Sequence, residues 1–214
     1  MRNKNSIIRL SRYKNALRRL KTMGFGRIFS DNLADAIGVN SCQVRKDFSI
    51  FGISGNKRGG YQIDELIEHL NNILGKNIIQ HAIIVGAGNI GAALAKYEGF
   101  EKDGIRIDAV FEADPLKVNP RADIPVLAAD DMIEFIQKND IRIGIIAVPE
   151  SAAQQVLDLM VLSGVKGILN FAPIRLRAPR ECVVNNVNLV LELENVIYFS
   201  NLLEKALEKD AQEA

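Results

Sequence analysis

The sequence predicts an α/β protein with three parts. These are an N-terminal winged helix-turn-helix domain (residues 1–76), a Rossmann-like domain with a doubly wound parallel sheet (residues 77–187) and a C-terminal dimerisation helix (residues 188–214). Three observations support this prediction. The first third of the chain is basic, a glycine-rich turn follows an apolar strand at residue 86, and the last predicted helix is apolar on more than one side.

Composition narrows the possible classes of protein. Of the 214 residues, 48% are apolar and 25% are charged, which fits one large or two small folded domains and excludes a disordered chain. No apolar run reaches the roughly 18 residues of a membrane span, and no apolar segment follows the basic N-terminus as in a secretory signal. Cys42 and Cys182 have no CxxC spacing and no nearby histidine, so neither a disulfide framework nor a metal site is expected. We expect a cytoplasmic protein.

Charge is distributed unevenly along the chain. Residues 1–75 contain 13 Lys and Arg against 6 Asp and Glu, whereas residues 76–214 contain 14 against 20. This asymmetry indicates that the first part faces a polyanion.

Helical patterns fill most of this basic part. Apolar residues recur at helical spacing over residues 6–22. Ser30 is then expected to cap a short helix that ends at Gly38, and Ser41 to cap a second helix over about 42–51. Two short helices joined through a glycine are typical of a helix-turn-helix, whose second helix enters the DNA major groove.

The second of these helices is the predicted recognition helix. Val44 and Phe48 would face the core, together with Ile50 or Phe51. Arginine and glutamine suit guanine and adenine edges, whereas lysine is a better partner for phosphate. The side chains left for DNA are Gln43, Arg45, Lys46 and Ser49.

A basic wing is expected next. Residues 55–63 (GNKRGGYQI) combine turn residues with a β-prone end, which predicts a hairpin with a basic tip. Arginine beside glycines suits the narrow minor groove. The predicted contacts are Lys57, Arg58, Gly59 and Gly60. A closing helix over 64–74 and a linker at 75–77 would complete the domain.

The motif GAGNIG at residues 86–91 follows the apolar strand 81–85 and opens a helix, which is the context of a dinucleotide-binding fingerprint. Gly86 would make the turn, Gly88 would admit the pyrophosphate and Gly91 would let helix and strand pack closely. Asn89 and Ile90 complete the loop, and the phosphates would lie on the N-terminus of the helix.

A carboxylate is expected about 20 residues further on, to bind the adenosine ribose. Glu112 directly follows the predicted strand 107–111 and is the expected carboxylate, and Asp114 is the alternative carboxylate. A carboxylate at this position favours NAD over NADP, because it repels a 2′-phosphate.

Predicted strands then alternate with predicted helices, which indicates a parallel sheet that binds its ligand at the carboxyl ends of the strands. The strands are expected at 124–127, 143–148, 167–171 and 183–187, and the helices at 130–139 and 151–163. Two such ends would flank a nicotinamide or form ordinary loops. Their residues are Ala147, Val148, Pro149 and Phe171.

The final helix, over 188–209, is too apolar to cover one face of a monomer, so we expect it to be buried in a dimer.

Three functions fit these parts. A dehydrogenase needs a proton donor, but no histidine follows His81, and Lys96, Tyr97, Lys166 and Tyr198 lie in no recognisable acid–base pattern. A DNA reader joined to a redox-cofactor domain favours a transcription factor that senses NADH, not an enzyme. The alternatives are a repressor that senses another nucleotide, such as an acyl carrier, and a cryptic NAD-dependent oxidoreductase.

The chain resembles the Rex family of redox-sensing transcriptional repressors from about Ile7 to Leu203. The resemblance is carried by residues 9–13 (RLSRY), 43–52 (QVRKDFSIFG), 55–61 (GNKRGGY), 86–91 (GAGNIG), 144–149 (GIIAVP), 167–173 (GILNFAP) and 191–199 (LELENVIYF). It implies a homodimer with domain-swapped C-terminal helices. Such a dimer would bind a palindromic operator on double-stranded DNA and release it when NADH rises relative to NAD⁺.

The resemblance also implies roles for single residues. Gln43, Arg45 and Lys46 match the family's recognition helix, and Lys57, Arg58 and Gly59 match its wing. Tyr97 matches a tyrosine near the nicotinamide, and Arg9 matches an arginine that couples the DNA-binding domain to the sensor. Asn188 stands where the family leads us to expect an aspartate. An amide can hydrogen-bond Arg9 or Tyr97 but forms no salt bridge, which changes the expected interdomain coupling.

Overall fold

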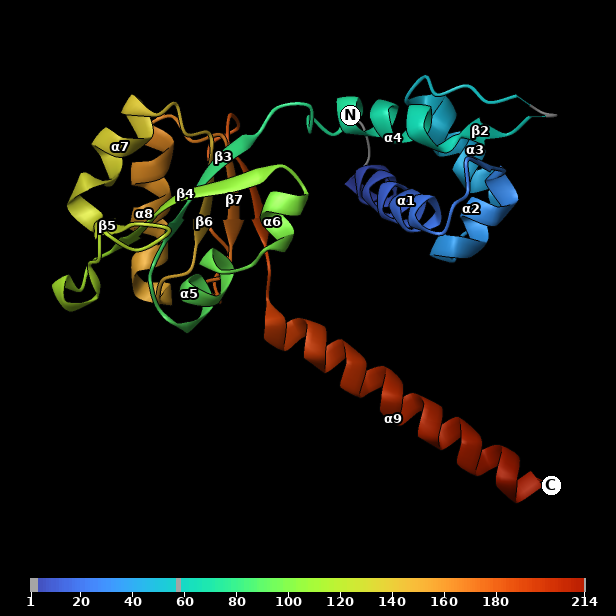
Figure 1. Ribbon diagram of the computed structural model, residues 1–214. Coiled ribbons are helices and arrows are strands. Elements are labelled where there is room, and N and C mark those ends of the chain that lie inside the picture. Colours follow the sequence, from blue (N-terminus) through green and yellow to red (C-terminus); the bar gives the residue numbers. More distant parts are fainter. Residues whose placement is uncertain (1–3, 57–58, 214) are drawn as a thin grey trace. The chain divides into compact units, whose positions relative to one another are not determined.

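The computed structural model describes residues 4–56 and 59–213 (Figure 1). Contacts divide the chain into two compact units, Met1–Ile79 and Gln80–Ala214. Each unit has its own hydrophobic core, so each is considered by itself.

Four helices and a small sheet form the first unit. The helices are α1 (Lys4–Thr22), α2 (Ser30–Ile37), α3 (Ser41–Ile50) and α4 (Ile63–Ile73), and the strands are β1 (Arg27–Ile28) and β2 (Tyr61–Gln62). The apolar stripes of the helices meet in one core, where the rings of Tyr13 and Phe48 pack edge to face at 5.3 Å. Gly38 ends α2 in the left-handed conformation (φ 72°), as predicted.

The helix starts differ from the prediction. Ser30 and Ser41 are the first residues of their helices and not their caps. Phe29 precedes α2 and makes no side-chain cap, whereas Asn40 caps α3 by accepting a hydrogen bond from Gln43 N at 2.7 Å. The backbone of Asn40 is extended (φ −85°, ψ 154°), which brings its short side chain over the first turn.

The wing also differs from a simple hairpin. Strand β2 pairs antiparallel with β1, more than thirty residues earlier in the chain, and Ile63 begins α4 instead of extending the strand. Gly60 (φ 63°) lies against the carbonyl of Ile28, where a Cβ would overlap it, and this close approach holds the wing against β1. Asn56 and Gly60 form an antiparallel β-bridge. Lys57 and Arg58 lie outside the described residues.

A six-stranded parallel sheet forms the second unit, in the order β5-β4-β3-β6-β7-β8. The strands are β3 (Gln80–Val85), β4 (Ile105–Glu112), β5 (Val126–Ala128), β6 (Ile143–Ile146), β7 (Gly167–Asn170) and β8 (Val183–Asn186). The predicted doubly wound parallel sheet is therefore confirmed. The strand order reverses between β3 and β6, which is where such sheets bind ligands.

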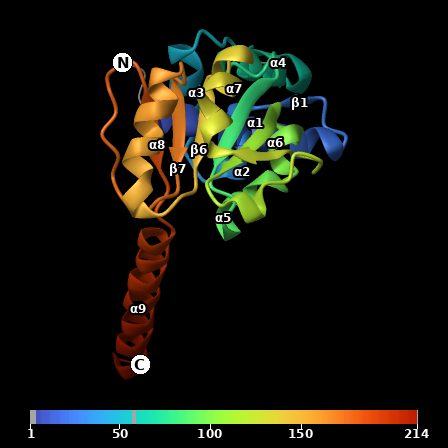
Figure 2. The same ribbon diagram turned by 90° about the vertical axis from the view of Figure 1, so that its left-hand side faces the viewer.

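Helices cover both faces of the sheet (Figures 1 and 2). Helices α5 (Asn89–Ala95) and α6 (Gly99–Lys102) pack on one face, and α7 (Met132–Lys138) and α8 (Glu150–Leu162) pack on the other. Short 3₁₀ turns occupy Pro115–Lys117 and Ala129–Asp131, so the helix expected over 130–139 begins with a 3₁₀ turn.

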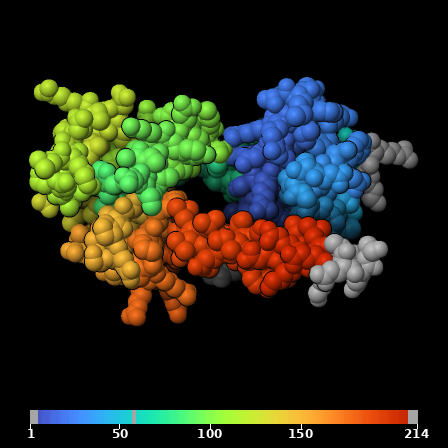
Figure 3. Space-filling model, turned by 90° about the horizontal axis from the view of Figure 1, so that it is seen from below, coloured from blue at the N-terminus to red at the C-terminus, as the bar shows by residue number. Residues whose placement is uncertain are grey.

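Helix α9 (Leu189–Glu213) ends the described chain. The side chain of Asn188 caps it, because Asn188 Oδ1 accepts hydrogen bonds from Val190 N and Leu191 N at 3.1 Å each. Figure 3 shows this helix in red. Its large apolar side chains are each more than half exposed. They are Leu189, Val190, Leu191, Leu193, Val196, Ile197, Tyr198, Phe199, Leu202, Leu203 and Leu207. Within the described residues, neither α9 nor any other helix combines the length and apolarity needed to cross a membrane.

Candidate functional site

Helix α3 presents the expected polar face. Arg45, Lys46 and Ser49 are exposed, whereas Val44 and Phe48 are fully buried. Phe51 packs against the core, whereas Ile50 is 49% exposed. Of the two residues that the sequence offered, Phe51 is therefore the one that faces the core.

A hollow of about 300 Å³ lies next to this face. The Arg45 side chain, 52% exposed, borders it, and its Nη1 lies 3.9 Å from Asp31 Oδ1. The hollow is lined by Phe29, Ser30, Asp31, Arg45, Gly55, Asn56, Gly60 and Tyr61. Helix α3 and the described part of the predicted wing therefore share one concave surface.

Asp47, which the sequence analysis did not single out, is the centre of a buried polar network in α3. Asp47 has no exposed surface, and both of its oxygens accept from Arg9, at 2.6 Å from Nε and 2.7 Å from Nη2. The Tyr13 hydroxyl (3.0 Å) and Gln43 Nε2 (2.9 Å) also donate to it. The position of Asp47 between Val44 and Phe48 in the buried stripe is the signal that could have revealed this network.

The ionisation of these groups follows from the contacts. Burial alone raises the pKa of Asp47, but the hydrogen bonds from Arg9, Tyr13 and Gln43 together outweigh it and lower that pKa below the ordinary value. The hydrogen bond to Asp47 raises the pKa of Arg9, and burial raises the pKa of Tyr13. At neutral pH Asp47 is a carboxylate and Arg9 is a cation.

Two positions of the glycine-rich loop have no room for a side chain, so they must be glycine. A Cβ on Gly86 (φ 102°) would overlap the carbonyl of Ala147, and a Cβ on Gly91 would overlap the carbonyl of Gly86. Gly88, the residue before α5, has open space where its Cβ would point. Asn89 and Ile90 are exposed at the start of α5. The loop is thus packed closely against neighbouring backbone at Gly86 and Gly91 and has open space beside Gly88. This shape fits a pyrophosphate.

Glu112 closes one side of this loop. Its Oε2 accepts from Ala87 N at 2.7 Å, and its Oε1 accepts from Ala113 N at 2.8 Å and Asp114 N at 3.0 Å. Burial alone raises the pKa of Glu112, yet these backbone donors lower it overall, so a negative charge stands beside the loop. Asp114 instead caps the 3₁₀ turn, where its Oδ1 accepts from Leu116 N at 3.0 Å.

The carboxyl ends of β6 and β7 lie on the other side of the loop. Ala147 N donates to Val85 O at 2.8 Å, and Phe171 N donates to Ile146 O at 2.9 Å. The side chain of Val148 faces Gly86, and Pro149 precedes α8. The structure therefore brings the loop, Glu112 and this apolar edge together.

Tyr97 is separated from the loop by the length of α5. It is 60% exposed, and its ring packs edge to face on Phe100 at 5.2 Å. Arg9 is paired with Asp47 in its own unit, and Asn188 caps α9. The coupling expected between Arg9, Tyr97 and Asn188 therefore stays a prediction.

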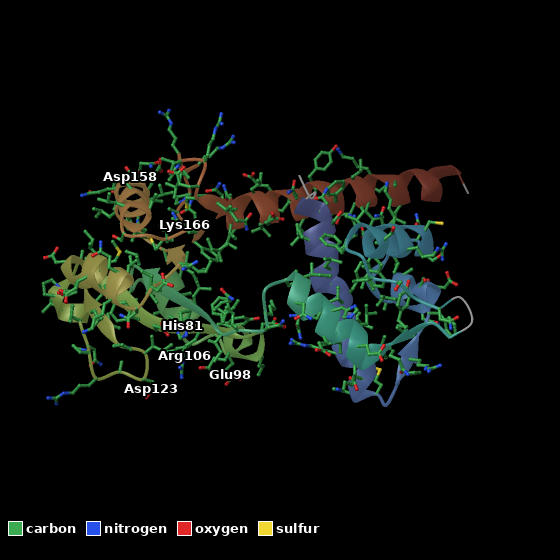
Figure 4. All side chains as sticks on the ribbon, turned by 90° about the horizontal axis from the view of Figure 1, so that it is seen from above. His81, Glu98, Arg106, Asp123, Asp158 and Lys166 are labelled. Carbon is green, nitrogen blue, oxygen red and sulfur yellow. The ribbon has the colours of Figure 1, made fainter. Side chains whose placement is uncertain are left out.

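Two basic groups of the sheet lie away from the loop (Figure 4). His81 stands near the start of β3, where its Nδ1 lies 2.8 Å from Asp108 Oδ2, and Lys166 precedes β7. Both positions are at the amino ends of strands, opposite the edge that carries Gly86. Over residues 4–56 and 59–213, the structure contains no group of three potential metal ligands.

Comparisons with known proteins match both units. Residues 4–49 match a family described as a putative DNA-binding protein N-terminus, and residues 77–174 match a family described as a CoA binding domain. The "Redox-sensing transcriptional repressor Rex" of Desulforamulus reducens is 40% identical over 201 residues, which cover 94% of this chain and 96% of that protein.

Solved structures agree with this relationship. RSP, a Rex-family repressor, in complex with NAD⁺ and operator DNA is 35% identical, with a TM-score of 0.90 over 100% of this chain and 99% of that one. RSP in complex with NADH is 36% identical, with a TM-score of 0.85 over 97% of each chain. These relatives are named as repressors, which confirms the prediction of a regulator and not an enzyme. The chain belongs to the Rex family of redox-sensing transcriptional repressors.

Proposed function

We propose that this chain binds a palindromic operator as a cytoplasmic homodimer and leaves it when NADH binds. Residues 1–76 bind DNA, residues 77–187 bind the nucleotide and residues 188–214 form a swapped dimerisation helix. One observation carries the proposal: a single chain joins a basic recognition helix to a glycine loop shaped for a pyrophosphate. The RSP complexes with operator DNA, NAD⁺ and NADH support it.

The DNA contacts combine base reading with phosphate binding. Gln43 and Arg45 read bases in the major groove, and Lys46 and Ser49 bind the backbone. The wing, with Lys57, Arg58, Gly59 and Gly60, enters the minor groove.

The nucleotide lies over the loop, with its pyrophosphate at Gly88 and its adenosine ribose at Glu112. Ala147, Val148, Pro149 and Phe171 form the apolar edge beside the nicotinamide. A neutral dihydronicotinamide loses less hydration energy on this edge than the cationic ring of NAD⁺. NADH therefore binds more tightly than NAD⁺.

Release of DNA requires that NADH bind the DNA-free dimer more tightly than the operator-bound dimer. A coupling free energy of about 1–3 kcal/mol weakens operator binding about 5–150-fold. The coupling involves Arg9, Tyr97 and Asn188. The exposed apolar residues of α9 support dimerisation, because a lone helix of this kind gains little stability in water.

Fluorescence anisotropy on a labelled operator, selected from a random palindromic library, tests the proposal. We expect NADH to release the protein at concentrations where NAD⁺ leaves the complex intact. Binding that ignores both nucleotides would contradict the proposal, as would equal dissociation constants for NADH and NAD⁺ by calorimetry.

The family match over residues 77–174 favours one alternative, a repressor that senses an acyl carrier such as coenzyme A. The same assay separates the two, because coenzyme A then releases the operator and NADH does not. The negative charge of Glu112 beside the loop favours NADH, since coenzyme A carries a 3′-phosphate on its ribose.

A further inference from the structure

The side chain of Gln43 is tied to a buried carboxylate, and this bond decides which amide atom faces outward. Gln43 Nε2 donates to Asp47 Oδ1 one helical turn further along α3. An ionised carboxylate can only accept hydrogen bonds, so the nitrogen of the Gln43 amide must face it.

The Asp47 carboxylate has no acceptor site to spare. Oδ1 accepts from Arg9 Nη2 and Gln43 Nε2, and Oδ2 accepts from Arg9 Nε and the Tyr13 hydroxyl. A carboxylate offers about four such sites, and all are filled. If the Gln43 amide turned over, its oxygen would face Oδ1 and repulsion would replace the hydrogen bond. The network therefore fixes the orientation of the amide.

The oxygen of the same amide remains available. Among the residues that the structure describes, no donor bonds to Gln43 Oε1. Gln43 lies in the first turn of α3, and the first residues of a recognition helix are those that reach base edges. A glutamine with both amide atoms free reads adenine through N6 and N7 together. With one N–H of its nitrogen held by Asp47, Gln43 turns its oxygen outward as the acceptor, and the second N–H of the amide stays free beside it.

We infer that Asp47 orients Gln43 so that its oxygen accepts a hydrogen bond from the exocyclic amine of one adenine or cytosine in the operator. Asp47 is then a positioning residue for sequence specificity. The inference rests on the proposed function, because it requires α3 to lie in the major groove.

Modified operator duplexes and the full-length protein test this inference. Each adenine of a half-site is replaced by purine, which lacks the N6 amine, or by 7-deazaadenine, which lacks the N7 acceptor. Each cytosine is replaced by pyrimidin-2-one, which lacks the N4 amine. Every duplex is measured with wild type and Gln43→Ala, so that changes in base pairing cancel in the double-mutant cycle.

At one position, we expect loss of the amine to weaken wild type about three- to tenfold more than Gln43→Ala, the size of one neutral hydrogen bond. A loss with 7-deazaadenine that is specific to wild type, without any such loss on a base that lacks its amine, would overturn the inference, because it would show that the nitrogen of Gln43 and not its oxygen contacts the base. Equal behaviour of the two proteins on every duplex would also overturn it. Failure of the proposed function would appear differently, as no operator binding or no release by NADH.

Asp47→Asn gives a second readout, because an amide at position 47 can donate to Gln43 Oε1 and let the glutamine turn over. We expect this variant to lose selectivity for the amine. Asp31→Asn is the matched control, since Asp31 is exposed near Arg45 and does not contact Gln43. A folded Asp47→Asn protein that keeps the wild-type profile would refute the role of Asp47. If the variant does not fold, the measurements of wild type and Gln43→Ala on the modified duplexes test the inference by themselves.

Discussion

The predicted recognition helix α3 and the glycine-rich loop form their proposed binding surfaces in different ways. On α3, a buried carboxylate at Asp47 orients the side chains of Arg9 and Gln43 through hydrogen bonds. At the loop, Gly86 and Gly91 matter because they lack side chains, and the backbone itself forms the surface. The two surfaces should therefore respond to different kinds of substitution.

The difference shows what each ligand demands. A pyrophosphate has the same shape in every dinucleotide, and a rigid backbone suits it. An operator is one sequence among many, and reading it requires side chains with defined donors and acceptors. We expect steric changes to damage the loop most and electrostatic changes to damage α3 most.

Gly91→Ala should give the largest effect. Its Cβ would overlap the Gly86 carbonyl, so the loop must shift at a cost of about 1–3 kcal/mol. We expect NADH affinity to fall about 100-fold by calorimetry, a change of about 3 kcal/mol, while operator binding persists without NADH. Gly88→Ala is a comparison for protein stability only, because its Cβ points into open space. Gly88→Ala should leave thermal stability unchanged while still weakening NADH. Wild-type NADH affinity in Gly91→Ala would show that the close packing is not needed.

Asp47 should give a pH-dependent effect of intermediate size. Because its folded pKa is lowered, its contribution to stability is complete above the ordinary aspartate pKa of about 3.9 and is lost as the pH falls through the lowered pKa. We expect urea unfolding to show wild type about 2 kcal/mol more stable than Asp47→Asn at pH 7. The difference should shrink below about pH 4. A difference that does not change down to pH 3 would contradict the charged network.

Glu112→Gln should give the smallest effect. The glutamine oxygen can still accept from Ala113 N and Asp114 N, whereas its amide nitrogen cannot accept from Ala87 N, and the repulsion of a 2′-phosphate disappears. We expect the preference for NADH over NADPH to fall about tenfold, or about 1.4 kcal/mol, in competition titrations. Asp114→Asn should leave the preference unchanged, because Asp114 caps a turn. If Asp114→Asn alone changed the preference, the second of the two predicted carboxylates would be the ribose partner.

Much of the fold was predictable from local patterns. The apolar strand before Gly86 and the alternation that follows it specify a parallel sheet, because both faces of such strands are buried. Helix ends were less predictable, since Ser30, Asn40 and Ser41 are all good capping residues and the backbone angles decide among them. Strand β1 was missed, because two residues carry no periodic signal and their partner is distant in the chain.

The sequence by itself determined the two functional parts of this protein, because glycine spacing, charge and helical periodicity act over short distances along the chain. It also predicted that Gln43 and Arg45 lie on a DNA-recognition helix. Only the tertiary structure decided that Asp47 binds Arg9, 38 residues away, and that this carboxylate holds the nitrogen of Gln43. Such a network depends on how α1 packs against α3, and the free energy of that packing is spread over the whole core.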